Sequence, residues 1–136
     1  MNPTLLLDTH VWLWWLLGQA ELPARERKAL DALAGAGTPP GLSAISLWEA
    51  QMLVAKGRLK IDAPLSHWLP TAAAAESVTP LPMDAAVILA LDSLPAGFDG
   101  DPADHIIVAT ARAHGLPLAT QDRAIRRSRA VKVWRA

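Results

Sequence analysis

Short apolar runs along the chain alternate with longer stretches in which apolar residues recur at helical spacing. Five runs have the length and composition of buried strands: residues 4–7, 42–45, 77–81, 116–120 and 131–134. The remaining periodic stretches predict helices over residues 10–17, 23–35, 47–56, 65–75, 83–94, 102–114 and 122–127. Strands that alternate with helices are typical of a parallel sheet with helices on both faces. The pattern therefore predicts an α/β fold.

Glycine and proline residues support these boundaries. Three predicted helices are each followed by a glycine, the residue that commonly ends a helix: Gly18, Gly57 and Gly115. Pro23 suits the first position of the second helix. Loops are expected over residues 37–41 and 95–101, which contain glycine and proline. The chain has 136 residues and no internal repeat, so we expect one domain over residues 1–136.

The composition excludes several classes of site. The sequence contains no cysteine, which excludes disulfides, thiolate zinc sites and a cysteine nucleophile. Hydrophobic residues make up 51% and charged residues 19%, as in folded rather than disordered chains. The apolar N-terminal stretch is interrupted by Asp8 and His10, is too short to span a bilayer and follows no basic segment. We therefore expect a cytoplasmic protein with no membrane partner.

The charges are unevenly distributed although they balance overall. Residues 123–136 contain six basic residues and no acid. Residues 1–122 contain the other seven basic residues and all thirteen acidic ones, which gives a formal charge of −6. Two interpretations remain open: an acidic cleft beside a strip that binds a polyanion, or an ordinary solvated basic surface.

Acidic residues lie near four of the predicted helix starts, on the side where the strands end. Asp8 and Asp122 follow two predicted strands, and Glu49 lies one turn into a helix. Asp101 and Asp104 open the helix over residues 102–114. In a doubly wound sheet the carboxyl ends of the strands border the functional crevice. We therefore expect these five side chains to converge.

Each acid also has a purely structural interpretation. Ser46 and Glu49 have the spacing of a capping box, in which two side chains satisfy free N–H groups at a helix start. The other four acids suit N-cap or first-turn positions, where a negative charge favours the helix dipole: Asp8, Asp101, Asp104 and Asp122. Taken singly, each acid fits a cap well. Four acidic helix starts at one sheet edge favour a shared site.

A shared site of this kind predicts metal chemistry. Carboxylates gathered in one cleft repel one another, which raises their pKa values unless a cation joins them. Mg²⁺ and Mn²⁺ prefer such oxygen ligands. One or two of these ions can activate water and stabilise charge on a phosphodiester. The basic residues from Arg123 onward would then contact the flanking backbone.

Four segments carry a resemblance to a known family. They read LLDTHVW at residues 6–12, LSAISLWE at 42–49, DPADHIIVATA at 101–111 and LATQD at 118–122. In their order, and in the length of the chain, they resemble the PIN-domain family, specifically the VapC-like ribonuclease toxins of bacterial type II toxin–antitoxin pairs. Together the four segments extend over almost the whole chain.

The resemblance implies a three-layer α/β/α sandwich with a mainly parallel central sheet, and an endoribonuclease with Mg²⁺, or Mn²⁺, as cofactor. Four residues match the family's catalytic and metal-binding quartet, and a fifth matches an additional metal-binding acid: Asp8, Glu49, Asp104 and Asp122, then Asp101. Thr9 and Thr120 match small hydroxyl positions beside the site. His105 stands where the family commonly has arginine, so no cationic substrate contact is expected there.

The resemblance also implies three partners: an RNA substrate, a cognate antitoxin and a second copy of the chain. Residues 12–15, Trp-Leu-Trp-Trp, form an apolar band that is wide for one face of a small core. We expect a partner to cover part of this band. The band alone does not distinguish a homodimer from an antitoxin complex.

Two other functions remain as alternatives. A catalytically silent interaction module of the same fold would use the acids as caps, and it would not bind Mn²⁺ through them. A phosphoacceptor receiver domain also has an acidic pocket. It is disfavoured because the sequence lacks an adjacent acidic pair near the end of the first strand and a lysine after Thr120.

Overall fold

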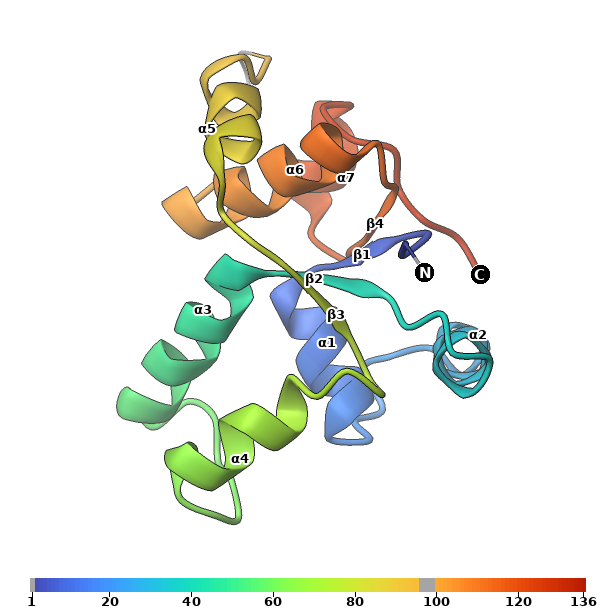
Figure 1. Cartoon of the computed structure of the whole chain (residues 1–136), viewed down its shortest axis with the longest axis vertical. Helices are drawn as coiled ribbons and strands as arrows, with labels where there is room; N and C mark the ends of the chain where they lie inside the picture. Colours follow the sequence, from blue (N-terminus) through green and yellow to red (C-terminus); the bar gives the residue numbers. More distant parts are fainter. Residues whose placement is uncertain (1, 96–99) are drawn as a thin grey trace.

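The computed structural model describes residues 2–95 and 100–136. Its centre is a four-stranded sheet of order β3-β2-β1-β4, in which every strand pair is parallel (Figure 1). The strands are short: β1 (Leu6–Leu7), β2 (Gly41–Ser43), β3 (Thr79–Leu81) and β4 (Leu118–Ala119). Most of the predicted loop 95–101, residues 96–99, lies outside the described residues.

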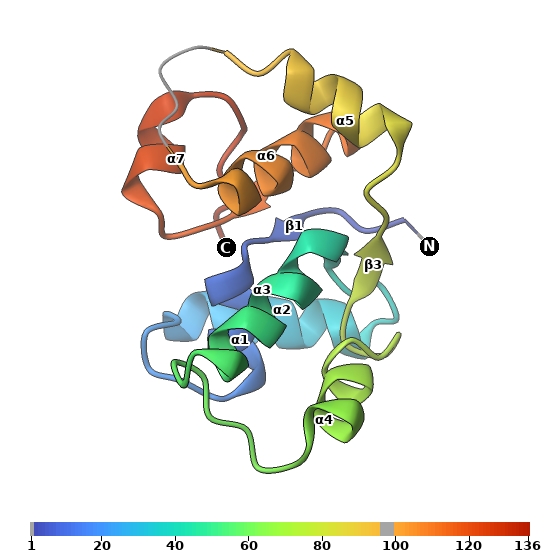
Figure 2. The same ribbon diagram turned by 90° about the vertical axis from the view of Figure 1, so that its left-hand side faces the viewer.

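Helices cover both faces of this sheet. Those in the described residues are α1 (Thr9–Leu16), α2 (Ala24–Gly35), α3 (Ala44–Ala55), α4 (Leu65–Ala72), α5 (Ala85–Asp92), α6 (Pro102–His114) and α7 (Arg123–Ser128). Figure 2 shows α5, α6 and α7 on one side of the strands and α1 to α4 on the other. The predicted three-layer fold with a parallel sheet is confirmed.

The alternation of side chains along β1 divides the interior into two cores. Leu5 and Leu7 pack with Trp12 of α1 and Leu30 of α2 on one face. Leu6 lies on the other face, in a core with residues of α6 and α7. All three leucines are buried, so β1 holds the two helical layers together.

The strands end at one edge, and helices begin there almost at once. Only Asp8 separates β1 from α1, and α3 follows β2 directly. Residues 120–122 connect β4 to α7. The backbone N–H of Asp8 donates to the carbonyl oxygen of Ala119 at 3.0 Å, which fixes the first and last of these junctions side by side.

Several predicted boundaries differ from the structure by a few residues, as at the end of α4, which is Ala72 rather than residue 75. The helix predicted from residue 47 begins at Ala44, so the strand before it ends at Ser43 rather than at Ile45. The strand predicted over 131–134 is reduced to one parallel bridge between Leu118 and Val133. Two backbone hydrogen bonds of 2.8 Å still join this C-terminal segment to Leu118. The Leu118 N–H donates to the carbonyl oxygen of Lys132, and the Trp134 N–H donates to the carbonyl oxygen of Leu118.

The tryptophan band is less exposed than the sequence suggests. Trp12 and Leu13 belong to the buried core, while Trp14 and Trp15 are half-buried. The indole N–H of Trp15 donates to Asp31 of α2 at 2.8 Å. Within the described chain, no helix combines the length and apolar character needed to cross a membrane.

Candidate active site

A cleft of about 320 Å³ opens at the carboxyl edge of the sheet. All five predicted acidic residues line it, together with three residues that the sequence did not assign to a site: Asp8, Glu49, Asp101, Asp104 and Asp122, with His10, Trp14 and Gln121. The expected convergence of the acids therefore occurs. Their individual catalytic and metal-binding roles remain predictions.

Asp8 is held by a threonine from the far end of the chain. It occupies the N-cap position of α1, but its side chain makes no capping hydrogen bond. Instead, the Thr120 hydroxyl donates to Asp8 Oδ2 at 2.7 Å. The same hydroxyl oxygen accepts the backbone N–H of Asp122 at 3.0 Å. One hydroxyl thus positions two of the acids, and the alternative interpretation of the Asp8 side chain as a helix cap does not hold.

Glu49 is held in an equivalent way from α1. The Thr9 hydroxyl donates to Glu49 Oε1 at 2.5 Å and lies 2.8 Å from the Ser46 hydroxyl. The predicted capping box of Ser46 and Glu49 is wrong, because α3 begins two residues before Ser46 and its N-cap is Ser43. Ser46 is therefore buried within the first turn, and Glu49 is free to line the cleft.

The remaining acids combine helix capping with a place in the cleft. Asp101 caps α6, accepting the N–H of Asp104 at 2.8 Å, and Asp122 caps α7, accepting the N–H of Ile125 at 2.9 Å. These capping predictions are confirmed. The Asp104 carboxylate lies in the first turn of α6 and is half-buried. Gly115, with φ +64°, ends this helix in the left-handed conformation that glycine favours.

Burial and crowding raise the pKa values of three of the carboxyl groups. For Asp104 they raise the pKa to about 7, through burial first and then through repulsion from the acids around it. Burial also raises the pKa of Asp8 and of Glu49, and in each the threonine hydrogen bond opposes the rise. The folded chain therefore keeps carboxylates in a place where their charge is unfavourable without a counter-ion.

The donor set fits a hard divalent cation. Five carboxylates supply oxygen ligands, and for three of them, Asp8, Glu49 and Asp104, burial and then repulsion from nearby acids raise the pKa, as expected where no cation offsets the charge. In the parts of the chain that the structure describes, no three acidic or histidine side chains are already spaced to hold an ion together. Mg²⁺ commonly binds one or two carboxylates and keeps several waters, so it does not require such a group.

Three further residues complete the wall of the cleft. The rings of His10 and Trp14, one turn apart on α1, have centroids 6.1 Å apart. Gln121 lies between the threonine and the aspartate that follow β4 and donates from Nε2 to both oxygens of Glu26, at 3.3 and 3.2 Å. Its position inside the segment LATQD was the only sequence signal for Gln121.

The raised pKa of Asp104 predicts a pH-dependent gain of stability in Asp104→Asn. The folded-state pKa of about 7 lies above 3.8, the ordinary value for an aspartate, so ionisation of this group destabilises the fold as pH rises between those values. Without divalent cations, the substitution should raise Tm by roughly 2–5 °C near pH 8 and have little effect near pH 4. Thermal melts of both proteins in EDTA across this range measure the difference. A lower Tm for the variant near pH 8 contradicts the argument.

Comparisons with known proteins agree with this fold. The family model of the PIN domain matches residues 5–130 of the sequence. Ribonuclease VapC22 of Mycobacterium tuberculosis is 36% identical over 96% of this chain and 98% of its own length. The fold is similar to that of a chain in the crystal structure of VapBC2 from Rickettsia felis bound to a DNA fragment from their promoter, with a TM-score of 0.69, 17% identity and 98% coverage of both chains. For FitAcB from Neisseria gonorrhoeae the TM-score is 0.66 at 26% identity, with coverage of 99% of this chain and 97% of the other. The chain therefore belongs to the PIN-domain family and is a homologue of the VapC ribonucleases.

Proposed function

We propose that this chain is a metal-dependent endoribonuclease and the toxin of a bacterial toxin–antitoxin pair. The convergence of five carboxylates in one cleft is the observation that carries the proposal. Burial and repulsion raise the pKa of Asp8, Glu49 and Asp104, so their charged forms are unfavourable in the folded chain. A merely structural role does not account for such an unfavourable arrangement. Similarity to a ribonuclease over nearly the whole chain supports RNA as the substrate.

The acids would hold one or two divalent cations, with Mg²⁺ as the expected ion and Mn²⁺ as a substitute. The proposed ligands are Asp8, Glu49, Asp101, Asp104 and Asp122. A bound cation of this kind activates water for attack on a phosphodiester and offsets the charge that develops on the phosphate.

The chain's own contribution is to hold the carboxylates in place before the substrate arrives. Thr120 restrains Asp8, and Thr9 restrains Glu49, each through a hydrogen bond to one carboxylate oxygen. Both threonines are buried, so these bonds are protected from competing water. The arrangement limits the movement of the two acids when a cation and a phosphate bind.

A silent interaction module remains the second candidate, and two observations favour it. Asp101 and Asp122 do cap helices, and no three acidic or histidine side chains in the described residues are spaced for an ion. Neither observation accounts for Asp8 and Glu49, which cap nothing and are held facing the same cleft. Metal binding separates the two candidates.

An antitoxin is the proposed protein partner. The similar structures of VapBC2 and FitAcB support such a complex. In this chain a cavity of about 300 Å³, which we call the leucine groove, adjoins the acidic cleft. Four leucines line it beside the polar side chains of Gln19 and Arg58: Leu13, Leu17, Leu53 and Leu59. His10 and Trp14 line both cavities. One partner segment could fill the leucine groove and extend a basic side chain to the acids. A homodimer is also proposed on the family resemblance.

Metal binding by the acidic residues can be measured by calorimetric titration with Mn²⁺. Asp8→Asn and Asp104→Asn should each weaken binding by at least about tenfold, because a neutral amide replaces a charged ligand. Asp62→Asn is the matched control, since Asp62 is exposed and does not line the cleft. Equal affinities in all four proteins contradict a metal site at these acids.

Cleavage of RNA can be tested through Glu49→Gln. Glutamine keeps an oxygen that accepts the Thr9 hydrogen bond, so Tm should stay within a few degrees of that of the parent chain. The loss of charge should lower the cleavage rate by at least about 100-fold. Glu76→Gln, at an exposed position, supplies the control. A folded Glu49→Gln protein that cleaves RNA at the parent rate contradicts a catalytic role for Glu49, and a parent chain that does not cleave RNA supports the silent-module alternative.

Binding of the antitoxin can be tested by co-purification with the product of an adjacent small open reading frame. Leu17→Ser and Leu53→Ser, both half-buried in the groove, should reduce the yield of complex at least about tenfold. Leu89→Ser changes a side chain that is 69% exposed on α5 and should not. Loss of the complex in Leu89→Ser alone places the partner elsewhere.

A further inference from the structure

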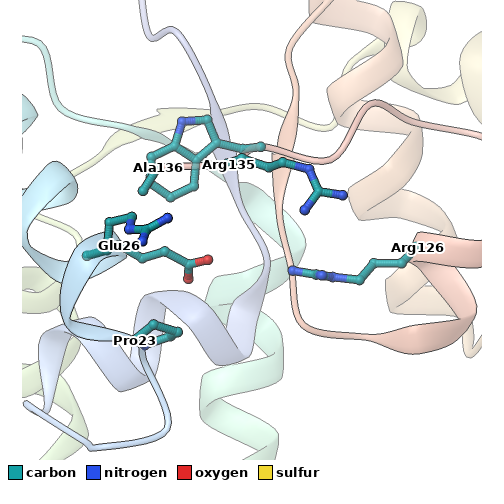
Figure 3. Close-up of a pocket in the computed structure, with 7 residues that line it drawn as sticks. Pro23, Glu26, Arg126, Arg135 and Ala136 are labelled. Carbon is teal, nitrogen blue, oxygen red and sulfur yellow. The ribbon is translucent and has the colours of Figure 1, made fainter.

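A further cavity, which is lined by basic residues and differs from the leucine groove, lies beside the acidic cleft. Arginines from α2, α7 and the C-terminal segment line this space of about 420 Å³, which we call the arginine cavity: Arg25, Arg126 and Arg135. Figure 3 shows the guanidinium groups of Arg126 and Arg135 pointing into the same space, with the Glu26 carboxylate across from them. Pro23, Trp134 and Ala136 complete the lining. The volume lies in the range of pockets that take small polar ligands.

The positive charge of this cavity is largely uncompensated by its hydrogen bonds. Arg126 donates from Nε to the Thr120 carbonyl oxygen at 2.9 Å and from Nη2 to Gln121 Oε1 at 3.4 Å, and both acceptors are neutral. Glu26, the acidic side chain in the lining, accepts hydrogen bonds from Gln121. Three guanidinium groups therefore share the cavity with one acidic side chain and the terminal carboxylate of Ala136, and the remaining positive charge predicts a site for an anion.

Gln121 forms a wall between the two cavities. Its side chain lines the acidic cleft and also hydrogen-bonds both Arg126 and Glu26 of the arginine cavity. The Thr120 carbonyl that receives Arg126 belongs to the residue whose hydroxyl binds Asp8. The two cavities are therefore neighbours, separated by the short segment that links β4 to α7.

We propose that the arginine cavity binds backbone phosphates of the RNA strand next to the phosphate that is cleaved. This inference rests on the proposed ribonuclease function for the identity of the polymer. A strand that places one phosphate at the acidic cleft must carry the next phosphates past its rim, and guanidinium groups bind phosphate oxygens in pairs. The arginine cavity supplies such groups on one side of the acidic cleft, and the single residue Gln121 separates the two.

The proposal also separates the arginines of the basic C-terminal segment by role. Arg126 and Arg135 line the cavity, whereas Arg123, Arg127 and Arg129 do not. Arg135 is as exposed as these three, so a place in the cavity and not exposure separates the two groups. Arg25 joins the site although it lies about a hundred residues earlier in the chain. Binding should therefore depend on which arginine is removed, and a solvated basic surface would show no such difference.

The test measures RNA binding in a chain that cannot cleave. The probe is a fluorescent single-stranded RNA of mixed sequence, titrated by anisotropy against Asp8→Asn at several salt concentrations. In that background, Arg25→Gln with Arg135→Gln should weaken binding at low salt by at least about tenfold and lower the slope of log K against log salt by about 1.4, or 0.7 for each lost contact. Arg126 is kept, because its Nε supports the Thr120 carbonyl.

Arg123→Gln with Arg127→Gln is the matched control, since it removes the same charge from residues that are as exposed as Arg25 and Arg135 but do not line the cavity. It should change affinity less than about threefold. Equal losses in the two double variants, or none in either, overturn the proposal in favour of a solvated basic surface.

The proposed ribonuclease function fails separately from this inference. Binding that depends on Arg25 and Arg135, in a chain whose parent does not cleave RNA, leaves the cavity as an RNA site and removes the catalytic assignment. If the parent cleaves RNA but binding does not depend on these two arginines, the catalytic assignment stands and the arginine cavity is not an RNA site. Circular dichroism of each double variant shows whether it is folded before its binding is compared.

Discussion

The hydrogen bond from Thr120 to Asp8 joins the ends of the two adjacent strands β1 and β4, and the site depends on this link. The Thr120 hydroxyl donates to Asp8 and accepts the N–H of Asp122, while its carbonyl oxygen accepts Arg126. Thr120 is buried, so water has little access to compete for these hydrogen bonds. One residue therefore ties the Asp8 carboxylate, the Asp122 backbone and the Arg126 guanidinium to the same strand end.

A second threonine has the same role on the other side of the cleft. Thr9, in the first turn of α1, contacts Ser46 and Glu49 of α3 through its hydroxyl. The first and third helices are thus fixed to each other at their N-terminal ends, where the cleft opens. Paired restraint of this kind keeps Asp8 and Glu49 close enough to repel each other, and the raised pKa of Glu49 includes a contribution from Asp8.

The fold tolerates this repulsion because the rest of the sheet is apolar and well packed. Leu5, Leu6 and Leu7 are buried in two cores, one on each face of β1. Stability comes from those cores, so the edge of the sheet is available for unfavourable charge. The arginine cavity lies on the far side of Gln121 from the acidic cleft. In the described part of the chain, the arginines are therefore near the clustered carboxylates but do not pair with them.

Local sequence pattern determined the order of elements and the place of the acids along the chain. Apolar runs and helical periodicity are short-range properties, and the direct succession of strand and helix puts Asp8 and Asp122 at strand ends whatever the rest of the chain does. The capping roles of Asp101 and Asp122 were also readable, since an N-cap needs only the next three residues.

Only the tertiary structure decided which side chains hold the site together. Thr120 and Asp8 are 112 residues apart, Thr9 and Glu49 are 40 apart, and Gln121 and Glu26 are 95 apart. No periodic pattern specifies contacts over such distances. The capping box failed for the same reason: Ser46 and Glu49 have the right spacing, but Thr9 from another helix binds both side chains, and α3 begins at Ala44, where β2 delivers the chain.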